Sequence, residues 1–355
     1  MTWASDARVS RRSILMGIGA VGTFLAVDLG AVAYANNWIG GQRFTSRAFV
    51  DRFQSVYGVH RGFRCNHAKG VAVSGYFDSN GDGRQLSGAT VLGAGHWPVV
   101  GRFSLGGGNP FTADTPKAPR GLGLAIGFAG RHQWRTAMLS LPVFPVNSPQ
   151  AFYDQLLASK TDPATGKPDP VAMKAFYAKY PASAAAATVL KEHRPTSGFA
   201  DSTFSSLNVF YFVSDSGDRT PVRWSFVPRQ TAQHAAQDSH NALFDALVRQ
   251  LKAAPLQWDL HLTIGTAEDP FDPTLAWPAQ RRVINAGTLV LDHIMAERAG
   301  NARDVSFDPL VLPDGIEPSD DPLLSARSAV YAQSYRARTG ESKSPSPIQV
   351  ETTAQ

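Results

Sequence analysis

Runs of small and apolar residues, separated by turn residues, set the pattern of the chain between residues 64 and 144. Two of these runs, 70–77 and 121–128, combine glycine with apolar residues and end at turn residues, which is typical of β-strands. Between them, residues 78–83 read Asp-Ser-Asn-Gly-Asp-Gly, a turn sequence. This part of the chain is therefore predicted to be mainly β-structure.

The second half of the chain repeats the strand pattern and adds helices. Apolar runs at 209–213 and 222–227 flank a polar turn at 215–218, which predicts a hairpin, and residues 258–264 alternate in part. Four stretches are typical of helices: 149–159, 172–193, 232–254 and 322–339. No repeat with a period of about 20–50 residues occurs, which excludes a solenoid. The fold class is predicted to be α+β, most simply an antiparallel barrel with helices around it.

The N-terminal segment resembles a twin-arginine export signal. Arg11 and Arg12 precede an apolar run at 14–27, and residues 33–35, Ala-Tyr-Ala, offer a cleavage site. The uninterrupted run is short for a membrane-spanning helix, which needs about 20 residues. We therefore expect residues 1–35 to be a signal peptide or a retained anchor. The domain would then be periplasmic or anchored to the inner membrane; the alternative is an accidental apolar start.

The composition limits the class of protein and the kinds of site that the chain can form. Of the 355 residues, 43% are hydrophobic and 18% charged, as in a globular protein. The single cysteine, Cys65, excludes an intramolecular disulfide framework and a thiolate metal cluster. A net charge of +5 is small, so it gives little support for a nucleic-acid partner. One domain is expected over 36–340, followed by a polar, flexible tail over 341–355.

A tyrosine near the C-terminus carries the first chemical signal. Arg327 and Tyr331 are four residues apart, so they share one face of a helix, and Arg338 returns to that face two turns later. Guanidinium groups on both sides stabilise a phenolate, which is a suitable ligand for ferric haem iron. From spacing alone, an amphipathic surface helix with a buried tyrosine remains the alternative.

Five motifs together indicate a family. They are His67-Ala-Lys-Gly70, Arg102-Phe-Ser104, Pro119-Arg-Gly121, Gly315-Ile-Glu-Pro-Ser319 and Arg327-x-x-x-Tyr331. In this order and spacing the chain resembles the haem catalases over residues 45–340, and within them the short catalase-related peroxidases. The resemblance implies a catalase-like eight-stranded antiparallel β-barrel without the C-terminal helical region of full-length catalases. It also implies haem b, iron protoporphyrin IX, as cofactor.

The resemblance assigns roles on the two faces of the haem. It implies that His67 is the distal acid and base that moves a proton between the peroxide oxygens, which suits an imidazole. Ser104 would hydrogen-bond the other ring nitrogen. On the proximal side, Tyr331 would be the axial ligand of the haem iron, and Arg327 would keep it ionised.

The resemblance also assigns residues that would hold the rest of the cofactor. Arg64, Arg102 and Arg338 match arginines that pair with the haem propionates, for which bidentate guanidinium–carboxylate contacts are suited. Phe152 lies near the position of a phenylalanine over the haem face.

Two departures from the family pattern bear on the reaction. The distal asparagine of catalases is replaced by Ser140 or Leu139, and Asn208 stands where many catalases have a histidine. Without the asparagine, oxidation of a second hydrogen peroxide should slow, so that an organic reductant can compete. Leu139 and Leu141 would make the distal pocket more apolar and admit alkyl hydroperoxides.

The sequence therefore predicts a haem peroxidase that reduces organic hydroperoxides and hydrogen peroxide through an oxo-ferryl intermediate, with weak or no catalase activity. Its partners would be a hydroperoxide and a reductant, with no nucleic acid, and it would be a monomer or a small homo-oligomer. Three alternatives stay open: isomerisation or dehydration of fatty-acid hydroperoxides on the same fold, a true small catalase, and a haem-free binding module.

Two further motifs have simpler interpretations. The glycines of 121–127 resemble a dinucleotide loop, but no strand–turn–helix unit surrounds them, so a tightly packed strand is favoured. Residues 78–83 resemble the start of a calcium loop, whose twelfth position would be Ala89, a residue that does not chelate. Neither motif changes the prediction.

Overall fold

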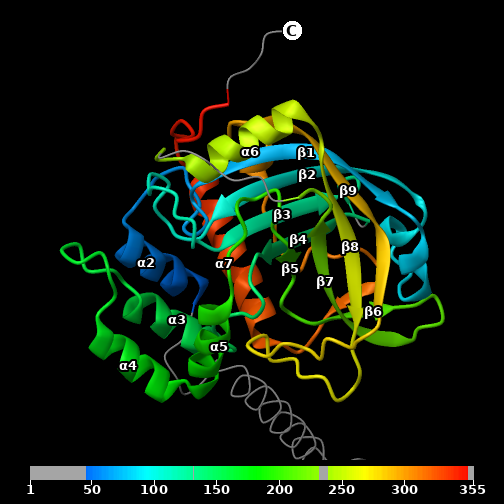
Figure 1. Ribbon diagram of the computed structural model, residues 1–355, viewed down its shortest axis with the longest axis horizontal. Helices are drawn as coiled ribbons and strands as arrows, with labels where there is room; N and C mark the ends of the chain where they lie inside the picture. The colour runs from blue at the N-terminus through cyan, green and yellow to red at the C-terminus, as the bar shows by residue number, and fades with distance from the viewer. Residues whose placement is uncertain (1–44, 131, 232–238, 351–355) are drawn as a thin grey trace, which may run out of the picture. The chain divides into compact units, whose positions relative to one another are not determined.

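Eight antiparallel strands close into a barrel in the computed structural model, which describes residues 45–130, 132–231 and 239–350 (Figure 1). Around the barrel the order is β7-β5-β4-β3-β2-β1-β9-β8, and pairing of β7 with β8 closes the ring. The strands are β1 (Gly70–Ser79), β2 (Gly95–Leu105), β3 (Arg120–Ile126), β4 (Trp134–Leu139), β5 (Phe204–Ser205), β7 (Arg219–Pro228), β8 (Leu256–Ile264) and β9 (Val283–Met295). The predicted eight-stranded antiparallel barrel is confirmed.

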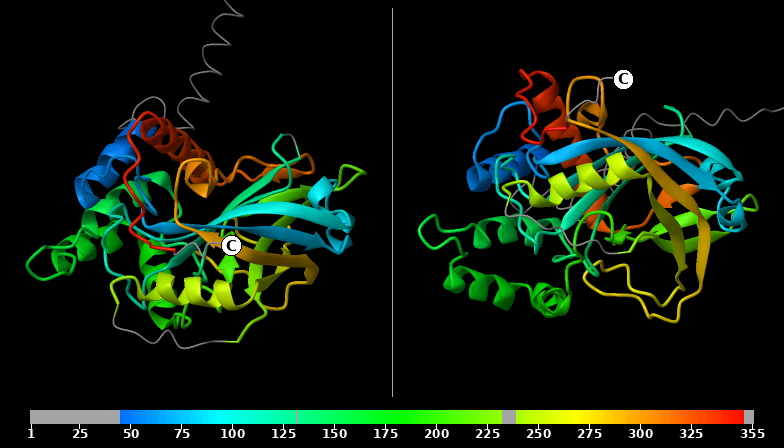
Figure 2. Two further views of the ribbon diagram at one scale, coloured as in Figure 1. Left: turned by 90° about the horizontal axis from the view of Figure 1, so that it is seen from above. Right: turned by 45° about the horizontal axis from the view of Figure 1, so that its top comes forward.

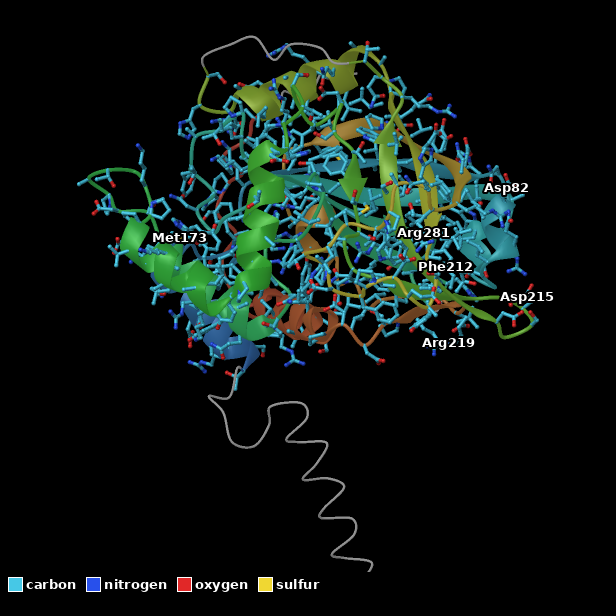
Figure 3. The ribbon with its side chains drawn as sticks, turned by 60° about the horizontal axis from the view of Figure 1, so that its bottom comes forward. Asp82, Met173, Phe212, Asp215, Arg219 and Arg281 are labelled. Carbon is cyan, nitrogen blue, oxygen red and sulfur yellow. The ribbon has the colours of Figure 1, made fainter. Side chains whose placement is uncertain are left out.

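Two short strands continue the sheet beyond β7: β6 (Phe210–Val213) and β10 (Ile316–Pro318). β6 and β7 form the predicted hairpin, with Val213 opposite Arg219 in the register. Asp215 and Arg219 lie at its projecting end, and Met173 of α4 (Pro170–Lys179) lies at the opposite end of the described region (Figure 3). Arg84 reaches Asp215 with an N–O distance of 2.5 Å, which ties the hairpin to the barrel.

The barrel interior is filled with aromatic and branched side chains. Burial alternates along β8, where every second residue from Leu256 to Leu262 is buried, as expected for a strand with one face on a core. The ring centroids of Phe103 and Trp258 are 5.8 Å apart, so side chains from opposite parts of the ring meet. The barrel is therefore a packed core, and a large ligand must bind outside it.

Six α-helices are described: α2 (Ser46–Tyr57), α3 (Pro149–Ala158), α4 (Pro170–Lys179), α5 (Pro181–Glu192), α6 (Ala242–Ala253) and α7 (Pro322–Thr339). Helices α2 to α5 gather at one end of the barrel beside α7, whereas α6 lies along the barrel wall away from them (Figures 1 and 2). Short 3-10 turns occupy Asp82–Gln85 (η1), Thr90–Leu92 (η2) and Ala302–Asp304 (η3). Within the described residues, none of the helices has the length and apolar composition needed to cross a membrane.

Helix α7 begins and ends where the sequence predicts, because its capping signals are strong. The Asp321 carboxylate accepts a hydrogen bond from the backbone N–H of Leu323 at 2.9 Å, and Pro322 occupies the first turn. The predicted helix 172–193 is instead two helices, because Pro181 begins a new helix after Tyr180. Helix α6 begins only at Ala242; the preceding residues 232–238 lie outside the described region.

Helix α2 and strand β9 are two of the elements that were not predicted individually. Helix α2 lies just after the segment assigned to export, and its buried face consists of only Phe49, Val50 and Phe53. Strand β9 carries two polar neighbours, Asp292 and His293, that are hydrogen-bonded to each other, and its register is irregular, so its hydrophobic alternation is broken. The predicted signal or anchor at residues 1–35 lies outside the described residues.

The predicted flexible tail is wrong for residues 341–350. Ile348 is fully buried in the barrel cluster, so the tail gains apolar contacts. The Glu341 carboxylate accepts a hydrogen bond from the Gly62 N–H at 2.5 Å, and the Arg303 guanidinium donates to the Ser344 carbonyl at 2.6 Å. Residues 351–355 lie outside the described part of the chain.

Candidate active site

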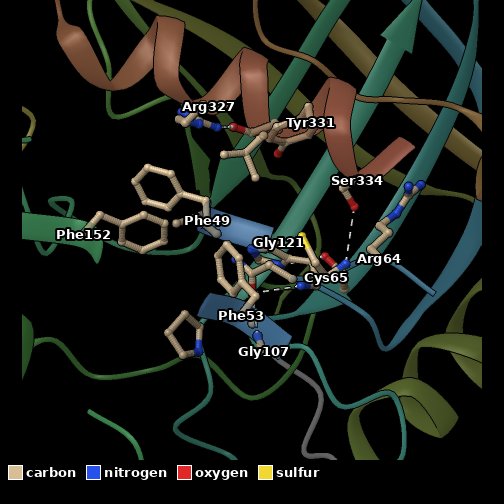
Figure 4. A pocket seen from close by; sticks show the side chains of 18 of the residues that line it. Phe49, Phe53, Arg64, Cys65, Gly107, Gly121, Phe152, Arg327, Tyr331 and Ser334 are labelled. Carbon is tan, nitrogen blue, oxygen red and sulfur yellow. Dashed lines mark hydrogen bonds between the residues drawn. The ribbon is translucent and has the colours of Figure 1, made fainter. Parts of the chain in front are cut away.

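A cavity of about 440 Å³ lies between the outer face of the barrel, α2, α3 and α7 (Figure 4). The structure brings all of the predicted site residues to this one cavity: Arg64, His67, Arg102, Ser104, Phe152, Arg327, Tyr331 and Arg338. They come from segments separated by up to 274 positions in the chain.

The barrel wall of the cavity is set by strand register. Gly70 of β1 pairs with Ser104 of β2, and Ser104 pairs with Gly121 of β3. Two positions along, Arg102 of β2 pairs with Gly123. Because alternate residues of a strand point to the same face, these residues share the outer face, while their neighbours fill the barrel core.

His67 lies directly before β1 with a φ of 53°, a left-handed conformation that is unusual for a residue other than glycine. Its Nδ1 is 3.1 Å from the Ser104 Oγ. The Asn66 carboxamide oxygen holds the loop by accepting hydrogen bonds from the N–H groups of His67 and Gly107, both at 2.9 Å. A Cβ on Gly121 would lie 2.8 Å from the Ser104 Oγ, so only glycine leaves room for the histidine–serine pair.

Burial keeps His67 uncharged at neutral pH. Burial is the largest cause, and the positive charges of Arg102, Arg327 and Arg64 add to it; together they lower the pKa of His67 to about 3. A neutral imidazole bonded to Ser104 through Nδ1 presents Nε2 to the cavity as the second ring nitrogen. This arrangement suits transfer of a proton within a bound substrate.

The α7 wall is held by side chains rather than by strand register. Arg327 donates through Nη1 to the Asn208 carboxamide oxygen and through Nη2 to the Ala137 carbonyl at 3.0 Å. The Asn208 amide donates in turn to Asp321 at 2.7 Å. Tyr331 follows Arg327 by one turn of α7 and enters the cavity beside it (Figure 4). A buried chain of hydrogen bonds thus fixes the guanidinium group next to the tyrosine.

The electrostatics of this chain follow from its burial. Asn208 is 2% exposed, and it follows Leu207, whose φ is 62°. Within the described residues, Leu207 and His67 are the two non-glycine residues with positive φ, one beside each wall of the cavity. Burial raises the pKa of Asp321, and the hydrogen bond from Asn208 offsets part of this rise.

One edge of the cavity is rich in arginine. Arg64 donates to the carbonyls of Ala302 and Val305, both at 3.0 Å, and Arg338 donates to the same Val305 carbonyl at 3.3 Å. Burial, followed by the charges of Arg102 and Arg338, lowers the pKa of Arg64 well below its usual value. Burial likewise lowers the pKa of Arg338 to about 10. Guanidinium groups this close together favour an anionic ligand.

The remaining part of the cavity is apolar. Phe49 and Phe53 reach it from α2 and meet Phe152 of α3, with ring centroids 6.3 and 5.9 Å from that of Phe152. Leu139 lines the cavity, whereas Ser140 does not, because its Oγ accepts a hydrogen bond from the Arg120 N–H at 3.0 Å. Of the two candidates to replace the distal asparagine, Leu139 is therefore the one that faces the site.

The barrel and the cavity on its outer face define the class of protein. The sequence model of the Catalase family matches residues 60–353, so the chain belongs to the catalase family. It falls in the short subgroup: it is 37% identical over 321 residues to a Catalase-related peroxidase of Synechococcus elongatus, covering 89% of this chain and 95% of the relative. A Catalase-related peroxidase of Mycolicibacterium paratuberculosis is 28% identical, over 82% of this chain and 94% of the relative.

Full-length catalases are matched over part of their length. A catalase of Glandirana rugosa is 27% identical, with 80% of this chain covering 58% of that protein. Among solved structures, a bacterial catalase superposes with a TM-score of 0.69 at 20% identity, covering 84% of this chain and 62% of its own. The chain thus spans about 60% of the length of the catalases that it matches.

Family membership implies a haem cofactor, and the residues of the cavity fit one. The phenol of Tyr331 suits ferric iron, and Arg64, Arg102 and Arg338 suit the two carboxylates at the edge of the porphyrin. The rest of the cavity lining is mostly apolar, which suits the faces of a porphyrin ring.

Several lining or supporting residues were missed by sequence reasoning. Phe49 and Phe53 were missed because α2 was not predicted. Asn66, between two motif residues, was overlooked although asparagine in a loop is a common backbone acceptor. Glu297 pairs with Arg102 from 195 residues away, and no local pattern indicates it.

Proposed function

We propose that this protein is a haem b peroxidase that reduces organic hydroperoxides and hydrogen peroxide, with weak or no catalase activity. The observation that carries this proposal is a neutral His67 bonded to Ser104 in a cavity where Leu139 takes the place of an asparagine. The balanced reaction is ROOH plus a two-electron reductant AH₂ giving ROH, H₂O and A.

Two residues would move the proton in this reaction. Nε2 of His67 would accept the proton of the hydroperoxide from one peroxide oxygen and return it to the other, which leaves as the alcohol. Ser104 keeps the imidazole oriented through Nδ1. Bound haem supplies the iron at which the O–O bond breaks and the oxidising equivalents are held. Tyr331 would bind the iron, and Arg327 would stabilise the negative charge of the Tyr331 phenolate.

The barrel wall, at the end of β4, would decide between peroxidase and catalase activity. A catalase holds a second hydrogen peroxide with polar groups, whereas Leu139 and Leu141 offer only apolar contacts. The aromatic part of the cavity, from Phe49, Phe53 and Phe152, would contact the alkyl group of an organic hydroperoxide. This lining supports a reductant-dependent reaction with alkyl substrates.

Product analysis tests this function against its main alternative. The haem-loaded protein is incubated with an unsaturated fatty-acid hydroperoxide, with and without an organic reductant. We expect the corresponding alcohol, formed in proportion to the reductant oxidised. Formation of an allene oxide or another isomer without consumption of reductant would overturn the proposal and favour the fatty-acid reaction, for which the same apolar lining is suited.

We further propose that residues 1–35 direct export, to the periplasm or to the inner membrane, and that the partners are a hydroperoxide and a reductant rather than a nucleic acid. The paired Arg11 and Arg12 before an apolar run support this proposal. Replacing both arginines with lysine should retain the protein in the cytoplasm in a fractionation experiment; unchanged export would contradict it. Size-exclusion chromatography would test the expected monomer or small homo-oligomer.

A further inference from the structure

Glu297 lies just beyond β9 and forms a fork with Arg102. Its two carboxylate oxygens accept hydrogen bonds from Arg102 Nε at 2.7 Å and Nη2 at 3.0 Å. The side chains are 5% and 3% exposed, so the pair is shielded from water. A two-point pairing of this kind fixes the plane of the guanidinium group as well as its position.

The surroundings hold Arg102 in this one place. Its Nη2 also donates to the Ala68 carbonyl at 3.2 Å. A Cβ on Gly70 would lie 2.4 Å from the guanidinium carbon, so Arg102 packs directly against the backbone of β1. With Nε and Nη2 bonded to the protein, Nη1 is the nitrogen left for a ligand in the cavity.

The charge of the arginine edge is not balanced by the protein. Among the described residues, Glu297 is the one carboxylate that forms an ion pair with any of Arg64, Arg102 and Arg338. Arg64 and Arg338 have backbone carbonyls as hydrogen-bond partners. Counted by themselves, these three guanidinium groups and Glu297 carry two positive charges, which equal in magnitude the charge of the two propionates of a haem. Two further charges lie nearby: Asp304 acts on Arg338, and Arg303 acts on Glu297.

We propose that Glu297 is a positioning residue that orients Arg102 and sets the charge of this edge to match a dianionic porphyrin. The proposal rests on the haem assignment above. Without the carboxylate, the edge would carry three positive charges against two propionates, and Arg102 would keep only its hydrogen bond to the Ala68 carbonyl. Glu297 therefore stabilises the empty cavity while limiting how strongly the edge attracts the anionic groups of its ligand.

The test is a haem titration of Glu297→Gln with two probes: iron protoporphyrin IX and its dimethyl ester, in which both propionates are uncharged. The ratio of the two affinities measures how strongly the edge binds the carboxylates. We expect this ratio to be about 10-fold larger in Glu297→Gln than in the parent protein, because one opposing charge is removed. The melting temperature of the haem-free protein should fall by about 5 °C or more, and haem should recover part of this loss.

Two variants serve as controls. Glu317→Gln removes an exposed glutamate that pairs with Arg219 at 2.9 Å outside the cavity, and should leave the affinity ratio unchanged. The double variant Arg102→Gln/Glu297→Gln restores the charge of the edge to two. The affinity ratio should therefore return towards that of the parent. This variant also allows the test if Glu297→Gln alone does not fold.

An unchanged ratio in Glu297→Gln, with equal losses of stability with and without haem, would overturn the proposal and leave a merely structural pair. A double variant with the ratio expected for the single variant would overturn it as well. Failure of the parent protein to bind iron protoporphyrin IX at all would instead contradict the haem assignment, so the two failures are distinguishable.

Discussion

The barrel wall and the α7 wall of the cavity are built in different ways. On the barrel wall, strand register and two glycines place Ser104 beside His67, with no space for an added carbon atom. On the α7 wall, Arg327 depends on a buried chain of side-chain hydrogen bonds through Asn208. The residue proposed to move the proton is thus placed by the backbone, whereas the proposed iron ligand lies beside a guanidinium group that side-chain hydrogen bonds hold.

The largest expected effect is on the α7 wall. Tyr331→Phe removes the phenol oxygen, the proposed iron ligand, so haem binding should be lost or weakened by more than about 100-fold, as measured by the Soret absorbance per protein. Tyr335→Phe, four residues further along α7 and absent from the cavity lining, is the matched control and should retain haem. Equal haem content in both variants would show that the ligand is assigned wrongly.

A substitution on the barrel wall should lower the reaction rate strongly without loss of haem. His67→Gln removes the proton-transfer group, so the rate of reaction with tert-butyl hydroperoxide should fall by about 10²–10⁴-fold in stopped-flow measurements. His96→Gln, at an exposed histidine paired with Asp78, should react at the parent rate. A His67→Gln variant that reacts as fast as the parent would remove the histidine from the mechanism.

The hydrogen-bond chain of the α7 wall should contribute to the free energy of unfolding. Asn208→Ala leaves the half-buried Arg327 and the buried Asp321 each without one partner, and should lower the free energy of unfolding by about 2–3 kcal/mol in urea titrations. Asn80→Ala, at an exposed asparagine that donates to the Asn285 carbonyl, should cost about 0.5 kcal/mol or less. Similar losses in the two variants would mean that the chain does not hold the α7 wall.

A smaller change should follow from restoring polarity to the barrel wall. Leu139→Asn places an amide next to Gly121 in the strand register, where it faces the cavity. Oxygen release from hydrogen peroxide, relative to oxidation of an organic reductant, should rise by about tenfold. Leu157→Asn, at an exposed position of α3, is the control and should leave this ratio unchanged. A ratio unaffected by Leu139→Asn would show that the missing asparagine does not limit catalase activity.

The pH dependence should be the smallest effect. The pKa of His67 is lowered from 6.5 to about 3, so the folded protein keeps this imidazole neutral as the pH falls from 7 to 5. The rate of reaction with tert-butyl hydroperoxide should therefore change by less than about twofold over this range, and fall only near the lowered pKa. A decline with an apparent pKa near 6.5 would contradict the buried, neutral state of His67.

The two walls also differ in how far the sequence predicts them. Helix α7 has an aspartate cap, a proline in its first turn and a motif spacing that puts Arg327 and Tyr331 on one face. Its bounds and the position of both residues in the cavity lining agree with these signals. The motifs around His67 and Ser104 were likewise visible, although the left-handed φ of His67 was not. Local signals were sufficient wherever a cap, a turn or a short motif determines the structure.

The parts that could not be predicted depend on distant contacts. The fork between Glu297 and Arg102 joins residues 195 positions apart, and burial of Ile348 depends on the completed barrel. Helix α2 has few buried residues of its own and packs mainly on α7 and α3, so its sequence carries a weak pattern. Tertiary packing determines these features, and a single sequence does not show it.

The central claim is that this cavity supports peroxidase rather than catalase chemistry. The most direct test records oxygen release and oxidation of an organic dye in the same reaction, with the haem-loaded protein and either hydrogen peroxide or tert-butyl hydroperoxide. We predict dye oxidation with both peroxides and little release of oxygen from hydrogen peroxide. Fast oxygen release from hydrogen peroxide, without peroxide-dependent oxidation of the dye, would contradict the account.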